Sequence, residues 1–275
     1  MDKKRVLYVS QEIFPYTNET KMGTMGSSLP QITQESGKDI RIFLPRFGTV
    51  NERRHQLHEV IRLSGMNLII DDFDHQLIIK VASIQQLRMQ VYFIDNEEFF
   101  PRRQLFHDSD GALLSNNDER MIFYCKGVIE TVRKLGWSPD VIHCQGWFTS
   151  LVPMYIKKLY ADDPLFENTK VIYSIFDNGY EGILSDTIID KLLFEDLKID
   201  DVNGLANLNI NQLNKFAASY ADGIVQASEN IDNEVIEYVK SLDKPFLEFP
   251  GEENYKDAYL DFYEIFTEEK EEVQA

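Results

Sequence analysis

Residues 5–28 read RVLYVSQEIFPYTNETKMGTMGSS and contain the pattern that decides the fold. Arg5–Ser10 has the apolar, β-branched and aromatic composition of a buried strand, and Lys21, Gly23 and Gly26 follow it in what we expect to be a loop before a helix. Glycines and a lysine in such a loop can hold an anion through backbone N–H groups. Neither a Walker sequence nor a GxGxxG fingerprint is present, so ordinary turn glycines are the favoured explanation.

Short apolar runs of the same kind recur outward along the chain. The expected strands are Ile40–Leu44, Gln76–Ala82, Met89–Ile94, Val141–Cys144, Lys170–Ile175 and Gly223–Ala227. Helical spacing of apolar residues predicts helices over Asp118–Leu135, Trp147–Tyr160, Asn211–Tyr220 and Asn230–Leu242. Strands that are apolar on both faces and alternate with helices predict an α/β fold, a Rossmann-like three-layer sandwich with a mainly parallel sheet.

Two polar segments raise the question of a metal site. Asp71–His75 lies between strand-like runs that follow one another without a helix, and its three carboxylates and histidine are explained better by a hairpin turn. His55 and His58 have the spacing of ligands on a helix, but an exposed polar turn is favoured there as well. We therefore expect no metal and no cofactor.

Charge and cysteine content narrow the classes of partner and compartment. The chain has 46 Asp plus Glu against 28 Lys plus Arg, a formal charge of −18, which disfavours nucleic acid and membrane surfaces as partners. The two cysteines match no metal spacing and no disulfide framework. No signal peptide or long apolar span is evident, so we expect a cytoplasmic location.

Two loops that follow strands have the composition of a ligand site. In His143-Cys144-Gln145-Gly146-Trp147 an aromatic ring stands beside polar donors, which suits stacking on a sugar while its hydroxyls are hydrogen-bonded. A histidine and a tryptophan that close the top of the core explain this segment equally well. Phe176–Gly182 is explained equally well by a cleft lining and by a plain surface loop. No hydrolase triad is evident, and we assign no catalytic residue.

Six segments, in order, resemble the first domain of bacterial glycogen and plant starch synthases. They are Val6–Pro15, Leu44–Gly48 (family LPRYG), Val91–Phe100 (YFLDNPEYF), Asn117–Arg120 (NAER), Asp140–Trp147 (DVVHAHDW) and Tyr220–Asp222 (YAD). The resemblance implies the first domain of a GT-B glycosyltransferase. Enzymes of this family transfer glucose from a nucleotide sugar, ADP-glucose in bacteria, to an α-1,4-glucan in the cleft between two domains, and they need no metal.

The resemblance implies a set of sugar- or glucan-binding candidates and also shows departures from the family pattern. The candidates are Glu12, Lys21, Gly23, Tyr92, His143, Gln145, Trp147, Asp177 and Tyr180. Of the family's KTGGL loop, Lys21 and Gly23 remain. Gly146 replaces an acidic residue, and Phe176 replaces a histidine that the family uses at its sugar site. A phenylalanine can neither donate a hydrogen bond nor stabilise developing charge there.

We therefore expect an accessory or α-glucan-binding protein that does not transfer glucose alone. Residues 1–250 would form the first domain of the family, without the second, and residues 251–275 an acidic helix and tail. Asp257–Phe266 is expected to fold back over the face that a second domain would cover. ADP-glucose, a synthase partner and self-association remain candidate interactions. The alternatives are a glucosyltransferase completed by a separate chain and a scaffold with no affinity for sugar.

Overall fold

A computed structural model describes residues 3–185 and 187–267 and contains one mixed, mostly parallel sheet. Its strands are β1 (Arg5–Ser10), β2 (Asp39–Pro45), β3 (His58–Glu59), β4 (Met66–Ile70), β5 (Phe73–Ile84), β6 (Met89–Asp95), β7 (Val141–Gln145), β8 (Lys170–Ile175), β9 (Gly223–Gln226) and β10 (Phe246–Leu247). The strand order is β10-β9-β8-β7-β1-β2-β6-β5-β3, and β4 pairs with β5. The pairs from β10 to β6 are parallel, whereas β5 runs antiparallel to β6, β3 and β4.

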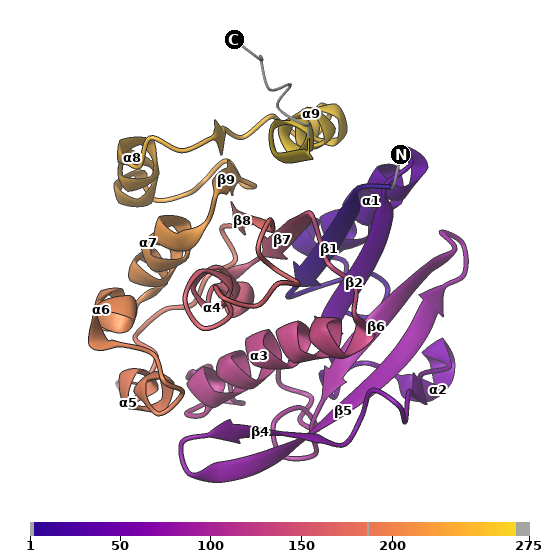
Figure 1. Ribbon diagram of the computed structural model, residues 1–275, viewed down its shortest axis with the longest axis vertical. Helices are drawn as coiled ribbons and strands as arrows, with labels where there is room; N and C mark the ends of the chain where they lie inside the picture. Colours follow the sequence, from indigo (N-terminus) through magenta and orange to yellow (C-terminus); the bar gives the residue numbers. More distant parts are fainter. Residues whose placement is uncertain (1–2, 186, 268–275) are drawn as a thin grey trace.

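Helices cover both faces of the sheet, as Figure 1 shows. They are α1 (Lys21–Glu35), α2 (Glu52–His55), α3 (Asn117–Leu135), α4 (Val152–Lys157), α5 (Ile188–Leu193), α6 (Ile199–Val202), α7 (Ile210–Tyr220), α8 (Asn233–Ser241) and α9 (Tyr255–Thr267), with short 3-10 turns at Trp147–Thr149 and Asn203–Leu205. Side chains on successive strand residues point to opposite faces. In β8, Tyr173 hydrogen-bonds Asn214 of α7, whereas Ser174 faces the α9 side. The expected α/β three-layer fold is confirmed.

The predicted strands agree with the observed ones closely, but one predicted helix and one predicted loop are wrong. Trp147–Tyr160 is not one helix: a 3-10 turn is followed by α4, which begins at Val152. Pro153 explains this start, because proline has no N–H to donate within a helix and is favoured in the first turn. Lys21–Ser28 is not a loop either, because α1 begins at Lys21. Thr20 is its N-cap and accepts a hydrogen bond from the Gly23 N–H at 2.9 Å.

Glycine in α1 permits close packing rather than a turn. A Cβ at Gly26 would lie 2.4 Å from the Glu12 carbonyl oxygen, and one at Gly23 would lie 2.8 Å from the Asn18 carbonyl oxygen. The start of α1 therefore lies directly against the loop that leaves β1. Glycine is required here for contact between backbones, which the sequence pattern did not distinguish from a turn.

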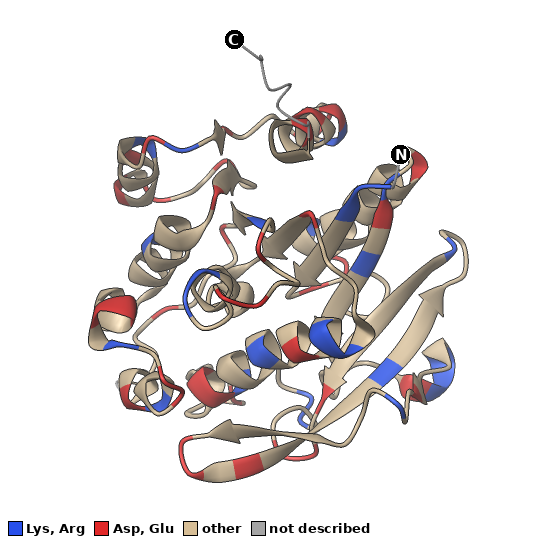
Figure 2. Ribbon diagram, viewed as in Figure 1, with Lys and Arg blue, Asp and Glu red and all other residues tan. Residues whose placement is uncertain are grey.

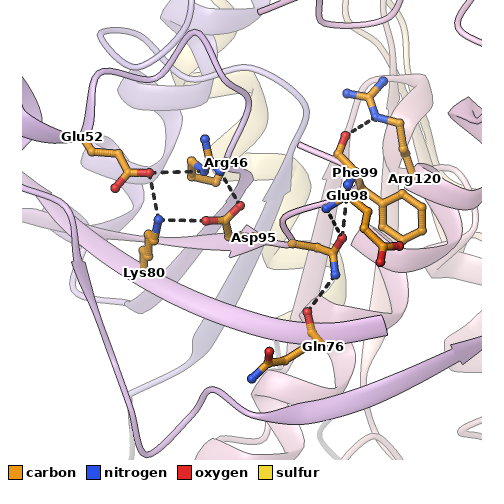
Figure 3. Close-up of polar contacts among 9 residues, drawn as sticks. Arg46, Glu52, Gln76, Lys80, Asp95, Glu98, Phe99 and Arg120 are labelled. Atoms are coloured by element: carbon orange, nitrogen blue, oxygen red, sulfur yellow. Dashed lines mark hydrogen bonds and ion pairs between the residues drawn. The ribbon is translucent and has the colours of Figure 1, made fainter. Parts of the chain in front are cut away.

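The segments Leu44–Gly48, Val91–Phe100 and Asn117–Arg120 contact one another in a buried polar network, shown in part in Figure 3. Arg46 and Lys80 each approach the Asp95 carboxylate to 2.9 Å, and Lys80 also lies 2.8 Å from Glu52. Arg120 donates from Nε to the Phe99 carbonyl at 2.8 Å. Much of the sequence resemblance therefore lies in residues that hold the sheet and its loops together.

Helix α9 lies beside α1 on one face of the sheet and contacts β7. Tyr259 and Tyr263 are fully buried, and the Tyr8 hydroxyl donates to the Tyr263 hydroxyl at 3.1 Å. Asp257 and Asp261 lie on the exposed side of this amphipathic helix. The tail residues Glu268, Glu269, Lys270, Glu271 and Glu272 lie outside the described residues. The division at residue 250 stays a prediction.

Candidate functional site

The candidate site lies at the carboxyl ends of β1 and β7. β1 pairs with β2 on one side and with β7 on the other. The direction in which successive strands are added to the sheet therefore reverses between β1 and β7. A crevice at such a switch point is the usual ligand position in open α/β sheets. Gln11 joins the two loops here, because its Oε1 accepts a hydrogen bond from the Phe148 N–H at 3.0 Å.

Glu12 is brought together with groups from two other loops. Its Oε2 accepts a hydrogen bond from the Thr20 hydroxyl at 2.5 Å, and its Oε1 accepts one from Asn178 Nδ2 at 3.3 Å. The side chain is nearly buried, with an exposed fraction of 8%. Glu12 therefore positions the start of α1 and the loop after β8. Asn178 lies in the segment Phe176–Gly182, which the sequence indicated as a possible cleft lining. Asp177 and Tyr180 of this segment were predicted as site residues, but Asn178 was not.

Lys21 is exposed at the N-terminus of α1, where a helix carries partial positive charge. Its Nζ lies 3.3 Å from Glu252 and 4.5 Å from the centre of the Phe249 ring. The segment before α9, rather than α9 itself, thus reaches the carboxyl edge of the sheet. Neither Phe249 nor Glu252 had a signal in the sequence, because both contacts join residues more than 200 positions apart.

Met22 occupies the space beside Gly146. A Cβ on Gly146 would lie 2.7 Å from Met22 Cε and 2.7 Å from Gln11 Oε1, and Gly146 has a φ of 88°. Met22 is buried, with 2% exposed. An acidic side chain at position 146 would require Met22 and Gln11 to move, so the two departures from the family pattern are physically linked.

Gln145 ends β7 and is fully buried. Its Oε1 accepts a hydrogen bond from the Ser10 hydroxyl at 2.8 Å, while its Nε2 has no hydrogen-bond partner among the described residues. Asp177 is exposed, and its Oδ1 accepts a hydrogen bond from the Ser228 hydroxyl at 3.0 Å. Phe176 is buried, with 5% exposed, so no polar group replaces the family's histidine there.

Trp147 and Tyr180 pack against each other inside an aromatic cluster. Their ring centres are 4.9 Å apart, and Phe106 lies 4.7 Å from Trp147 on another side. Trp147 is 3% exposed. The Tyr180 hydroxyl donates to the Leu208 carbonyl at 2.9 Å. Of the two explanations left open by the sequence, this packing favours the one in which Trp147 closes the core.

Tyr92 and His143 do not join the group at the carboxyl edge. Tyr92 lies in the middle of β6, with 8% exposed, and stacks on Phe43 at 5.1 Å. His143 is fully buried in β7, two residues before Gln145. One of its ring nitrogens lies 2.7 Å from the Tyr263 hydroxyl of α9 and the other 2.6 Å from the Ser174 hydroxyl. Both are occupied within the protein.

We predict that His143 makes the stability of the protein depend on pH. Burial lowers the pKa of His143 from 6.5 to about 3. The unfolded chain therefore takes up a proton below pH 6.5 that the folded chain does not. Above pH 6.5 the free energy of unfolding is not reduced by His143. As the pH drops from 6.5 toward 3, it falls by up to about 1.4 kcal/mol per pH unit.

The measurement is the free energy of unfolding in urea between pH 7.5 and 5, for the natural protein and for His143→Gln. Removal of the imidazole costs stability at every pH. It should also reduce the slope of the free energy of unfolding against pH by the equivalent of about one proton. Equal slopes in the two proteins would contradict this prediction, because they would show that His143 takes up its proton at the same pH in the folded and the unfolded chain.

The two polar segments considered for metal binding lie in the turn between β4 and β5 and at the end of α2. The turn between β4 and β5 contains Asp71, with a φ of 56°, as predicted for a hairpin. His55 ends α2 and His58 lies in β3, so the two histidines do not share a helix. Over residues 3–185 and 187–267, no group of three or more His, Cys, Asp or Glu is placed to hold a metal ion, and no helix is long and apolar enough to cross a membrane.

Comparison with known proteins shows which family shares this arrangement. A family model described as starch synthase catalytic domain matches residues 5–245. A glycogen synthase of Chlorobium limicola is 35% identical over 84% of this chain and 47% of its own length, and one of Chlorobaculum tepidum is 33% identical over 89% and 49%. The chain therefore spans about half the length of the curated relatives it matches.

The fold has a counterpart among solved structures. The catalytic domain of starch synthase IV from Arabidopsis thaliana, bound to ADP and acarbose, superposes with a TM-score of 0.73 at 17% identity. The match covers 90% of this chain and 51% of that one. At this identity the likeness concerns the arrangement of strands and helices.

Proposed function

Because this chain belongs to the starch and glycogen synthase family, we propose that it binds α-glucan and that these 275 residues alone do not transfer glucose. The relatives are glycogen synthases, and the starch synthase IV domain is described with ADP and acarbose. We extend glucan binding, rather than catalysis, to the present chain. We also propose a cytoplasmic location, in keeping with the free, buried thiols of Cys125 and Cys144.

The observation that carries the proposed inactivity is the position of Met22 beside Gly146. A thioether fills the space beside Gly146, where the family resemblance places a carboxylate. Phe176 likewise presents a buried ring where the resemblance places an imidazole. Glycosyl transfer needs groups that hold the donor and stabilise developing charge in a site from which water is excluded. Gly146 with Met22 beside it, and Phe176, replace such groups by apolar ones. The loops after β7 and β8 remain packed.

Other polar groups at the same edge support retention of binding. Lys21 and Asn178 remain at or near the carboxyl ends of β1 and β8. An ammonium and an amide can bond hydroxyl groups without any charge developing on the ligand. Binding and catalysis are thus separable in this chain, because they need different groups.

Two assays on the purified protein test the proposal. We expect the protein to sediment with glycogen and to release no ADP from ADP-glucose in the presence of maltoheptaose. Bovine serum albumin serves as the sedimentation control. Absence of sedimentation with glycogen would contradict the binding role and favour a scaffold. ADP release by the pure protein would contradict inactivity, whereas release only after a cell extract is added would favour a transferase completed by another chain.

A further inference from the structure

A concave surface begins beside the carboxyl edge and runs along α1 toward the turn between β5 and β6. Its volume is about 720 Å³, within the range of roughly 300–1,000 Å³ that is usual for ligand pockets. We call it the Phe14 groove. Residues that line it include Phe14, Tyr16, Gln31, Gln56, Gln85 and Gln86.

One side of the groove is a polar stripe on α1. Thr24, Ser27, Ser28 and Gln31 line it at positions i, i+3, i+4 and i+7, which lie on one face of a helix over a length of about 10 Å. The facing side holds the amides of Gln85 and Gln86, both exposed at the β5–β6 turn. Hydroxyls and amides of this kind can each donate and accept hydrogen bonds.

The groove differs in charge from the rest of the protein, because the described residues that line it include the cation Arg54 but no acid. The chain has 46 Asp plus Glu in 275 residues, yet among the described residues that line the groove none carries a carboxylate. The bordering hairpin tip shows basic but no acidic colour in Figure 2. Burial, and then the charge of Arg54, lower the pKa of His55, so its imidazole is neutral near pH 7. A lining without carboxylates disfavours a cation, and the guanidinium of Arg54, like the amides, can donate hydrogen bonds to the hydroxyls of a neutral sugar.

Two aromatic residues give the groove further features of a ligand site. Phe14 is 40% exposed, although most large apolar side chains of the chain are buried. Tyr16 is 3% exposed, and its buried hydroxyl has no hydrogen-bond partner in the described part of the chain. An unpartnered hydroxyl of this kind costs free energy unless another group bonds it. An exposed ring suits stacking on the apolar face of a sugar.

We propose that the Phe14 groove holds a stretch of α-glucan that continues away from the carboxyl edge along α1. The choice of glucan rests on the proposed function, while the location rests on the groove. A smaller pocket beside this groove is lined by Lys21 and Phe249. Thr24, at the start of α1, lines both the pocket and the groove, so a single chain of sugar units can contact both. The Phe14 ring stacks on one sugar, and the glutamine amides bond the hydroxyls of its neighbours.

The test is a calorimetric titration of the full chain with maltoheptaose, with cellohexaose as a β-linked probe. Phe14→Ala and the double variant Gln85→Ala/Gln86→Ala should each weaken binding of maltoheptaose about three- to tenfold, the worth of one stacking ring or of two hydrogen bonds. Phe73→Ala is the matched control. Phe73 is 67% exposed at the opposite end of β5, outside the groove, and its removal should leave affinity unchanged.

The outcomes separate this proposal from the proposed function. If the natural protein binds maltoheptaose but both groove variants keep its full affinity, the groove is wrong and glucan binding stands. Loss of binding in Lys21→Ala, with none in the groove variants, would confine the ligand to the carboxyl edge and also overturn the groove. Equal affinity for cellohexaose would overturn the α-linked ligand. If the natural protein binds no maltoheptaose at all, both proposals fail.

Discussion

Arg120→Met is expected to lower the free energy of unfolding by about 3 kcal/mol. Arg120 is 1% exposed, and its guanidinium donates to the Phe99 and Leu105 carbonyls at 2.8 and 2.7 Å and to Asn117 Oδ1 at 2.7 Å. Methionine fills much of the volume but donates nothing, so all three oxygens lose the hydrogen bond from Arg120. The burial that lowers the pKa of Arg120 to about 10 is an opposing cost, which keeps the expected loss moderate.

Arg102→Met provides the comparison, because the Arg102 side chain is exposed and its charge adds to the lowering of the Arg120 pKa. Its replacement should change stability by no more than about 0.5 kcal/mol. Unfolding in urea, followed by tryptophan fluorescence, measures both variants. Similar midpoints for Arg120→Met and the natural protein would show that the loop from Phe99 to Leu105 does not depend on this residue.

Trp147→Ala should cost about 3–5 kcal/mol, the usual range for removal of a buried large aromatic side chain. Trp147 contacts Phe106, Phe148 and Tyr180, with ring centres 4.7, 5.4 and 4.9 Å away. A cavity among these rings cannot close without moving the loop after β7. Trp147→Phe keeps much of the ring volume and should recover more than half of the loss.

The same pair of variants decides between packing and sugar stacking. If Trp147 serves packing, the folded Trp147→Phe variant binds maltoheptaose with the same affinity as the natural protein. Thermal unfolding then shows a loss of stability that is larger in Trp147→Ala than in Trp147→Phe. The opposite pattern, with natural stability and a tenfold loss of affinity in Trp147→Ala, would mean that the indole stacks on the ligand.

The strands could be predicted from sequence because each is a short apolar run with clear ends. Arg5–Ser10 and Lys170–Ile175 agree with β1 and β8 at both ends. The start of α1 could not be predicted in the same way, since its glycines and hydroxyl residues are poor helix formers. Contact between Gly26 and the Glu12 carbonyl overrides that preference. Elements such as β3 and α2 are too short for any periodicity to show.

The candidate site was predictable where it depends on neighbours in the chain. Glu12 and Lys21 were identified from the loop after the first strand, and both lie at the carboxyl edge. His143 was grouped with them because it is close in sequence, yet the Tyr263 hydroxyl, 120 residues away, accounts for one of its ring nitrogens. Glu252 beside Lys21 and Met22 over Gly146 are likewise contacts between distant segments. No local pattern contains that information.

The hydrogen bond between Tyr8 and Tyr263 joins positions 255 apart and has a consequence for how the protein is made. β1 leaves the ribosome early, but the face that holds Tyr8 and His143 gains the tyrosines of α9 only after almost all of the described chain has been translated. Until then the nascent sheet presents an uncovered centre, which favours chaperone binding or association with other chains. The covering of this face by α9 is therefore late relative to the synthesis of β1 and β7.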